Sequence, residues 1–413
     1  TRKHAKVSTK QQMLYMQQET QEVSGAFGCN LQIGGNDMHQ NNEKAVLKDV
    51  LKIGGAYAAF CIGSGFATGQ EIMQFFTAFG WAGIGSAIIT MILYVWMGVT
   101  LMRDGRKYSF TSDAAVWKHY CGKGLGVAMN CFGTFVIFGI YVVMIGGAGA
   151  SMEQYLGIPN LAGRLIMSGI CLVVALMGLN RLVDVIGFIG PVIIVCALAI
   201  GVVTIARDAG MIATAQQVLG SVKVTASCKN WVLSGFLYSG FMAFMIIPFI
   251  AQLGHSAQGS RKSGMLGGAC GGFFQVVAII VMLVAQMCNI ELIHNAQVPS
   301  LVLAEKINPV LAGVFVVIVL MGIFSTAVPL LWMLGHKAGP DKTKKFNITT
   351  VILVVAALIL SVLPFTVLVN KVYGLSGYVG IFAMAFTLIS QLRIASQEKK
   401  GQLPTGEPAS ENE

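Results

Sequence analysis

Charged side chains are scarce in this sequence, since Asp, Glu, Lys and Arg make up only 11% of its 413 residues. Soluble domains carry about 25% charged residues, and 55% of this chain is hydrophobic. Most of its surface must therefore contact something other than water, which excludes an ordinary soluble globular protein. Apolar runs of about 20 residues, enough to cross about 30 Å of hydrocarbon, recur along the chain. They predict an all-α polytopic protein in a lipid bilayer.

Motifs for metal binding and catalysis are also lacking. The nine cysteines show no CxxC or Cys/His spacing, so we interpret them as packing residues rather than as metal ligands or disulfides. The predicted spans contain no paired carboxylates and no Ser/His dyad, so we expect neither an intramembrane enzyme nor a cofactor. The net charge of +10 arises from basic residues in short loops between apolar runs. That placement indicates membrane orientation rather than nucleic-acid binding.

The given sequence starts with a polar stretch, and we expect no signal peptide there. Residues 1–43 are polar and aperiodic, and we expect a disordered cytoplasmic tail or an upstream extension there. Residues 44–392 form the predicted membrane-spanning domain, and 393–413 a second polar tail.

Ten apolar runs are recognisable. Their predicted bounds are 51–79, 81–102, 124–150, 162–179, 183–206, 231–251, 264–288, 310–335, 347–369 and 373–392. With a cytoplasmic N-terminus, six of the 28 basic residues lie outside and the other 22 inside, which follows the positive-inside rule. Both termini are therefore predicted to be cytoplasmic, in the cell membrane. The two five-span halves, about 51–206 and 231–392, would have opposite orientations, as in transporters with inverted repeats.

The first predicted span is interrupted near its middle, where it reads GSGFATGQE over residues 63–71. Glycine costs roughly 1 kcal/mol relative to alanine inside a helix, although small residues also let membrane helices pack closely. Thr68 and Glu71 have capping-box spacing, which favours a helix break here. Open backbone at this depth is tolerated where it lines a cavity. We therefore predict that substrate contacts Gly63, Ser64, Gly65 and Phe66.

The sixth span has a similar interruption at the matching position of the second half. It reads SGFLYSGF over residues 234–241, with Pro248 further on. Such paired interruptions point to a transporter binding site. Broken helices offer N–H groups to anions and carbonyls to cations, so a substrate carboxylate and a small cation are both predicted. The predicted pocket residues of this span are Tyr238, Ser239, Gly240 and Phe241.

The first-span motif, GSGFATGQEI over residues 63–72, resembles that of the YkvI-like bacterial membrane proteins. These are grouped with amino-acid permeases of the amino acid–polyamine–organocation superfamily, and the resemblance extends over about residues 48–392. More distantly, the plan is similar to the LeuT-type fold of neurotransmitter:sodium symporters. That fold has ten helices in two inverted five-helix repeats, with helices one and six unwound around substrate. The resemblance implies this architecture and an amino-acid substrate.

The LeuT-type resemblance also implies a sodium site between helices one and eight. By position, its ligands would be the carbonyls of Ala59, Ile62 and Gly322 and the hydroxyls of Ser325 and Thr326. Such oxygen ligands suit a hard cation. The alternative is that both hydroxyls only bond back to the preceding turn of their own helix. Some related transporters replace the sodium with a lysine on helix five, and the interior of span 183–206 contains no basic residue.

Two further side chains are candidates. The LeuT-type resemblance places Tyr141 where a tyrosine meets the substrate carboxylate, but a packing role is also open. Glu71 is a functional candidate because it is ionisable and lies within a span. It could accept a proton, belong to an outer gate, or cap the helix that begins near Thr68. We expect it above the substrate site, since an ionised carboxylate would repel an anionic substrate.

These observations predict a sodium-coupled secondary transporter that imports a small zwitterionic or carboxylated solute, most simply an amino acid. Two alternatives stay open. One is a proton-coupled permease that uses Glu71, and the other is a substrate-sensing membrane receptor on a transporter scaffold. The polar segment 1–43 is the feature that favours the receptor. The sequence specifies neither the substrate nor the oligomeric state.

Overall fold

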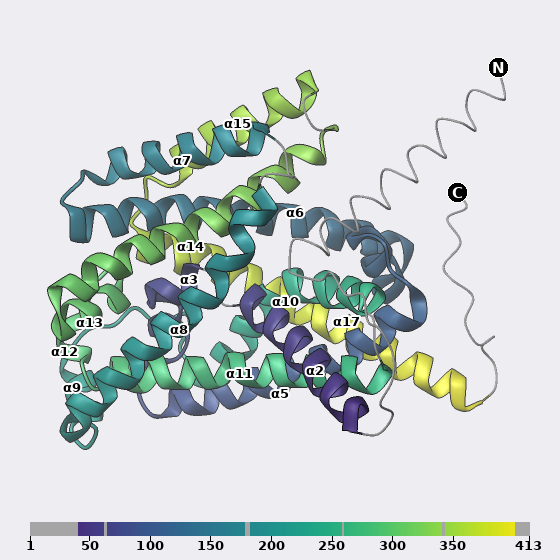
Figure 1. Cartoon of the computed structure of the whole chain (residues 1–413), viewed down its shortest axis with the longest axis horizontal. Helices are drawn as coiled ribbons and strands as arrows, with labels where there is room; N and C mark the ends of the chain where they lie inside the picture. The colour runs from purple at the N-terminus through teal and green to yellow at the C-terminus, as the bar shows by residue number, and fades with distance from the viewer. Residues whose placement is uncertain (1–39, 62–63, 178–181, 258–259, 341–342, 401–413) are drawn as a thin grey trace.

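The computed structural model describes residues 40–61, 64–177, 182–257, 260–340 and 343–400. Regular structure within these ranges is entirely helical. Long helices pack side by side, and the short helix α3 (Ser64–Thr68) lies in the middle of the bundle (Figure 1). Around it, α3 contacts α6, α8, α13 and α14. The centre of the fold is therefore formed by the segment that the sequence marks as interrupted.

The predicted apolar runs fall largely on helix where they are described, but run 347–369 is interrupted at residues 361–364, between α15 and α16. The long helices are α2 (Gln40–Cys61), α5 (Ala82–Tyr108), α6 (Asp113–Leu156), α7 (Asn160–Met177), α8 (Leu182–Asp208), α10 (Trp231–Ser256), α11 (Arg261–Met287), α14 (Pro309–His336), α15 (Lys344–Leu360) and α17 (Gly374–Lys399). Within the described ranges, seven helical segments are long and apolar enough to cross a membrane, or eight with one bent pair. The chain is thus a polytopic membrane protein. Ten spans in two inverted repeats remain a prediction.

Short helices occupy the connections. They are α9 (Ala215–Ser221), α12 (Ile290–Ile293), α13 (Pro299–Ile307) and α16 (Phe365–Leu368). The first three lie together at one end of the bundle (Figure 1), where α12 contacts both α9 and α13. A π-helical turn, Val369–Tyr373, joins α16 to α17. This turn brings Tyr373 into the interior, where it is 1% exposed.

The first span is divided, as predicted. Helix is described up to Cys61 in α2 and again from Ser64 in α3, and a break separates α3 from α4 (Gln70–Phe75). Gly69 forms this break with φ 79° and ψ −4°, a left-handed conformation that a side chain would strain. The predicted capping box does not form, because the Thr68 hydroxyl donates to the Gly65 carbonyl at 2.8 Å and Gly69 provides no side-chain cap. The predictions for residues 62 and 63 lie outside the described residues.

The prediction that the sixth span is unwound is wrong, since α10 is one continuous helix that includes Pro248. Its glycines allow close helix contacts instead. A Cβ on Gly235 would lie 2.6 Å from the Ser86 carbonyl oxygen of α5, and one on Gly240 would overlap the Gly377 carbonyl of α17. The Ser239 hydroxyl donates to the Gly235 carbonyl within α10 at 2.9 Å. Small residues therefore bring three helices together without breaking one of them.

Candidate functional site

Glu71 lies in the first turn of α4 with its side chain turned into the protein, 6% exposed. The Tyr238 hydroxyl donates to its Oε2 at 3.4 Å, and the Tyr373 side chain lies beside it. Its Oε1 lies so close to the Gly65 Cα that a Cβ there would overlap it. The carboxylate thus touches α3 itself. The expectation that Glu71 lies above the predicted substrate residues is corrected by this contact.

Further polar groups are buried close to this carboxylate. Tyr94 of α5 packs against Tyr238 with ring centroids 6.3 Å apart, and Gln275 of α11 lies beside Tyr238 and is fully buried. Within the described chain, the Tyr94 hydroxyl and both amide atoms of Gln275 lack a partner at hydrogen-bonding geometry. Buried polar atoms without partners are rare and costly. A bound ligand or ordered water at this position would satisfy them.

The described residues that touch the Glu71 carboxylate provide no positive counter-charge. The described groups that touch its carboxylate are Tyr238, Tyr373 and Gly65, and all of them are uncharged. An ionised carboxylate removed from water without a counter-charge costs several kcal/mol. In the buried state, this arrangement therefore favours a bound proton or a bound cation on the carboxylate.

Glutamine side chains hold the broken segment in place. The Gln286 amide of α11 donates to the Gly69 carbonyl at 2.8 Å and accepts from the Thr77 hydroxyl at 2.8 Å. The Gln74 amide of α4 donates to the Thr366 carbonyl of α16 at 2.8 Å. The sequence reasoning did not find these residues, although an uncharged amide in an apolar run is itself a signal. The Gly69 carbonyl thus accepts from a side chain of another helix in addition to the Met73 N–H of its own segment, at 3.0 Å.

The predicted pocket residues of α10 separate into two groups. Tyr238 and Phe241 line the region of Glu71, and Phe241 stacks on Tyr373 with ring centroids 4.4 Å apart. Ser239 and Gly240 instead take part in the helix contacts described above. On α3, Phe66 is buried at 1% exposure and adds to the apolar surroundings.

Tyr141 of α6 is fully buried, and its hydroxyl has no hydrogen-bond partner among the described residues. The Cys171 side chain of α7 lies near this hydroxyl. No described contact joins Tyr141 to Glu71, although α6 packs against α3. The role that the resemblance implies for Tyr141 remains a prediction.

The predicted sodium ligands are described only in part. On α14, the hydroxyls of Ser325 and Thr326 both donate to the Gly322 carbonyl, at 2.9 and 3.1 Å. This is the local bonding that the alternative interpretation predicts. Both hydroxyl oxygens keep lone pairs with which they could bind a cation, and α14 packs against α3. Ala59 lies near the end of α2, and Ile62 lies outside the described residues. The sodium site therefore remains a prediction.

Comparison with known proteins identifies relatives at low identity. No protein-family profile matches the sequence. The uncharacterized membrane protein YkvI of Bacillus subtilis (strain 168) is 23% identical over 331 residues, which cover 79% of this chain and 91% of that protein.

Solved structures share the fold. A manganese transporter of Eremococcus coleocola superimposes with a TM-score of 0.61 at 13% identity, covering 92% of this chain and 85% of the other. Mhp1 in its inward-facing conformation gives a TM-score of 0.50 at 12% identity, covering 86% of this chain and 95% of its own. At such identities the likeness shows a common fold, which is LeuT-like. The amino acid–polyamine–organocation superfamily is not shown by these matches.

Proposed function

We propose that this protein is a secondary transporter that imports a small zwitterionic or carboxylated solute, most simply an amino acid, together with sodium. The observation that carries this proposal is the divided first span, in which a buried carboxylate rests on the backbone of the central piece. The LeuT-like fold supports it, because the solved neighbours are described as transporters. Broken helices are where transporters of this kind bind substrates and ions.

The chemistry around α3 favours an amino acid. Glu71 offers one negative charge to an ammonium group, and no described contact supplies a competing positive charge. Phe66, Tyr238 and Phe241 are buried and make the surroundings of Glu71 apolar, which suits an uncharged substrate side chain. Sodium is proposed at the hydroxyls of Ser325 and Thr326, since α14 packs against α3.

Proton coupling through Glu71 is a second candidate, and the burial of this carboxylate without a basic partner favours it. A bound proton would remove the cost of burying the charge. A divalent metal as cargo, suggested by the manganese neighbour, is less favoured. No group of three or more His, Cys, Asp or Glu side chains that could hold a metal lies in the described part of the chain.

Uptake by proteoliposomes tests the proposal and separates the coupling ions. The solute is first chosen by a thermal-shift screen of purified protein against amino acids. Replacing external sodium by choline should then abolish its uptake, whereas an inward proton gradient without sodium should not restore it. Undiminished uptake in choline would exclude sodium coupling. If no amino acid shifts the unfolding temperature or enters the liposomes, the substrate class proposed here is wrong.

Glu71→Gln tests the second candidate. Under proton coupling, this variant should lose gradient-driven accumulation and keep exchange of solute across the membrane. Under sodium coupling, two measurements on this variant reveal whether the carboxylate contributes to ion binding. They are the half-saturating sodium concentration for uptake and the pH dependence of the uptake rate. Glu305→Gln is the matched control, because Glu305 lies exposed on α13 and loses the same charge.

A further inference from the structure

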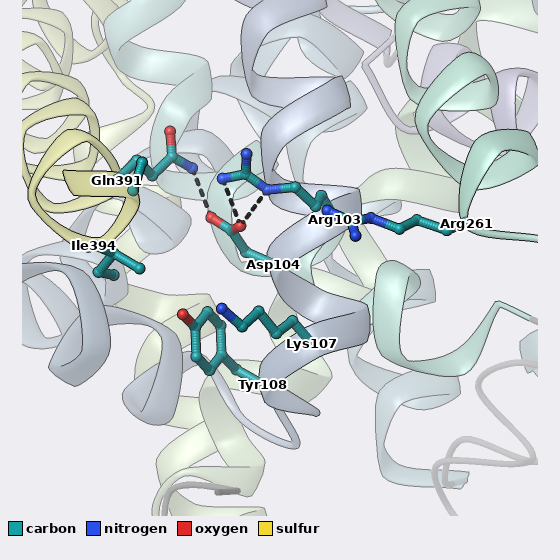
Figure 2. Close-up of a pocket in the computed structure, with 8 residues that line it drawn as sticks. Arg103, Asp104, Lys107, Tyr108, Arg261, Gln391 and Ile394 are labelled. Atoms are coloured by element: carbon teal, nitrogen blue, oxygen red, sulfur yellow. Dashed lines mark hydrogen bonds and ion pairs between the residues drawn. The ribbon is translucent and has the colours of Figure 1, made fainter. Parts of the chain in front are cut away.

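Asp104 of α5 and Glu71 of α4 are the two carboxylates buried in the described part of the chain. Asp104 forms an ion pair with Arg103 at 2.9 Å and accepts hydrogen bonds from Tyr120 and Gln391, both at 2.9 Å. Figure 2 shows Arg103 and Gln391 pointing toward this carboxylate. The partners of a buried carboxylate in this protein thus include a cation, a phenol hydroxyl and an amide.

The surroundings of Glu71 repeat this set without the cation. The Tyr238 hydroxyl donates to Glu71 Oε2 at 3.4 Å, and the Gln275 side chain lies beside Tyr238. The described groups that touch the Glu71 carboxylate are all uncharged. The positive charge that Arg103 brings to Asp104 can therefore come from a bound solute at Glu71. Under the proposed function, this charge is the ammonium group of an amino acid.

Three buried polar atoms beside Tyr238 also lack partners at hydrogen-bonding geometry in the described chain. They are the Tyr94 hydroxyl oxygen and the Oε1 and Nε2 atoms of Gln275. Both side chains are 0% exposed. Tyr94 reaches this place from α5, where its ring packs against that of Tyr238, and Gln275 reaches it from α11. At Asp104, by contrast, the Gln391 amide donates to the carboxylate.

The zwitterionic head group of an α-amino acid offers a partner to each of these atoms. Its ammonium group and its carboxylate are attached to one carbon, so neighbouring protein groups must bind them. The ammonium group can donate to Glu71 and to Oε1 of Gln275. The carboxylate can accept from Nε2 of Gln275 and from the Tyr94 hydroxyl. A simple amine would leave these two donors without partners, and a simple carboxylate would leave Glu71 without a counter-charge.

We propose that Tyr94 and Gln275 recognise the carboxylate of a bound α-amino acid, while Glu71 binds its ammonium group. The inference rests on the proposed function and narrows it to solutes that carry both charges on one carbon. It also places the carboxylate at α5 and α11. The resemblance implies Tyr141 of α6 for this role, but no described contact joins Tyr141 to Glu71.

The test measures binding of L-leucine to the purified full-length chain in detergent with sodium, by isothermal titration calorimetry. L-Leucine is the probe because its side chain suits the apolar surroundings of Glu71. Isoamylamine keeps this side chain and the ammonium group but lacks the carboxylate, and isocaproate lacks the ammonium group. The native chain should bind L-leucine at least about tenfold more tightly than either analogue, because each analogue leaves buried polar groups of the site without partners.

Two variants remove the proposed carboxylate donors. Tyr94→Phe should weaken L-leucine binding about tenfold, and Gln275→Leu should weaken it by about tenfold or more, since each loses a charge-assisted hydrogen bond. Isoamylamine should bind to both variants about as well as to the native chain. Gln275→Leu should not lower the unfolding temperature of the unliganded protein, because it replaces an amide without partners by an apolar side chain. Should this variant fail to fold, Tyr94→Phe tests the same point by removing one oxygen.

Tyr120→Phe and Gln391→Leu are the matched controls, because they delete the same groups beside Asp104. Both should lower the unfolding temperature and leave L-leucine affinity unchanged.

Equal weakening of L-leucine and isoamylamine binding in the site variants would overturn the inference, because it indicates general damage to the site. L-Leucine binding equally to the native chain and to both site variants would overturn the inference alone and assign the unpartnered atoms to ordered water. If neither L-leucine nor any other amino acid binds the native chain, the proposed function fails and this inference fails with it.

Discussion

Gly65→Ala places a methyl group where the Glu71 carboxylate now lies, because a Cβ at this position would overlap Oε1. The carboxylate must then move away from Tyr238 and Tyr373. A hydrogen bond to a charged group contributes about 1.5–3 kcal/mol, so losing the one from Tyr238 costs about that much. Alanine regains up to about 1 kcal/mol of helix propensity. We expect the free energy of unfolding to fall by about 0.5–2 kcal/mol, with loss of substrate binding.

A double-mutant cycle isolates the cause of this loss. Unfolding is measured by denaturant titration in mixed micelles for Gly65→Ala, Glu71→Ala and the double variant. If the clash with the carboxylate is the source, Gly65→Ala should cost little once Glu71 is truncated, giving a coupling energy of about 1 kcal/mol or more. Gly55→Ala is the control, since a Cβ there meets nothing within 4 Å. An equal cost of Gly65→Ala in both backgrounds would refute the reasoning.

Three further predictions concern the coupling ion and the helix contacts. Thr326→Ala should raise the half-saturating sodium concentration in uptake assays about tenfold, because an oxygen ligand is removed at a cost near 1.4 kcal/mol; an unchanged value would place sodium elsewhere. Gly240→Ala should destabilise the protein by about 1–3 kcal/mol through overpacking against α17, as measured by thermal unfolding. Gln286→Leu should leave the Gly69 carbonyl without its side-chain donor, which lowers substrate affinity and the unfolding temperature together; a fall in unfolding temperature alone would limit Gln286 to a structural role.

The helical architecture could be predicted from the sequence, because long apolar runs have few stable alternatives in a membrane. The division of the first span was also predictable, since three glycines within residues 63–69 are accompanied by polar residues. The sixth span shows why such patterns are ambiguous. Gly235 and Gly240 have the same local signature as a break, yet they allow close approach of α5 and α17. The partner of Gly240 is Gly377, which is distant in sequence, so one chain without its fold does not reveal the contact.

The site was predictable as a location but not as a set of contacts. Glu71 stands out in the sequence because it is an ionisable residue in an apolar run. In the structure, its carboxylate lies against Gly65. Tyr373 reaches the same carboxylate through a π-helical turn, which no periodic pattern predicts. Gln275 and Gln286 could have been noticed, because a spacing of eleven residues puts both on one face of α11.

The combination of a divided first span and a continuous α10 bears on how a cation could control access. Because α10 packs closely against α5 and α17, these helices move most simply as one body, whereas α3 and α4 are short pieces held by side-chain hydrogen bonds. In an open state, water solvates the Glu71 carboxylate at little cost. Closing the site removes that water, and the charge then opposes closure by several kcal/mol. Moving a two-state equilibrium from 1:99 to 99:1 takes about 5.5 kcal/mol, which is of the same order. Under the proposed function, a cation bound at Glu71 would offset this cost and favour the closed state, whereas an unoccupied carboxylate would favour the open state.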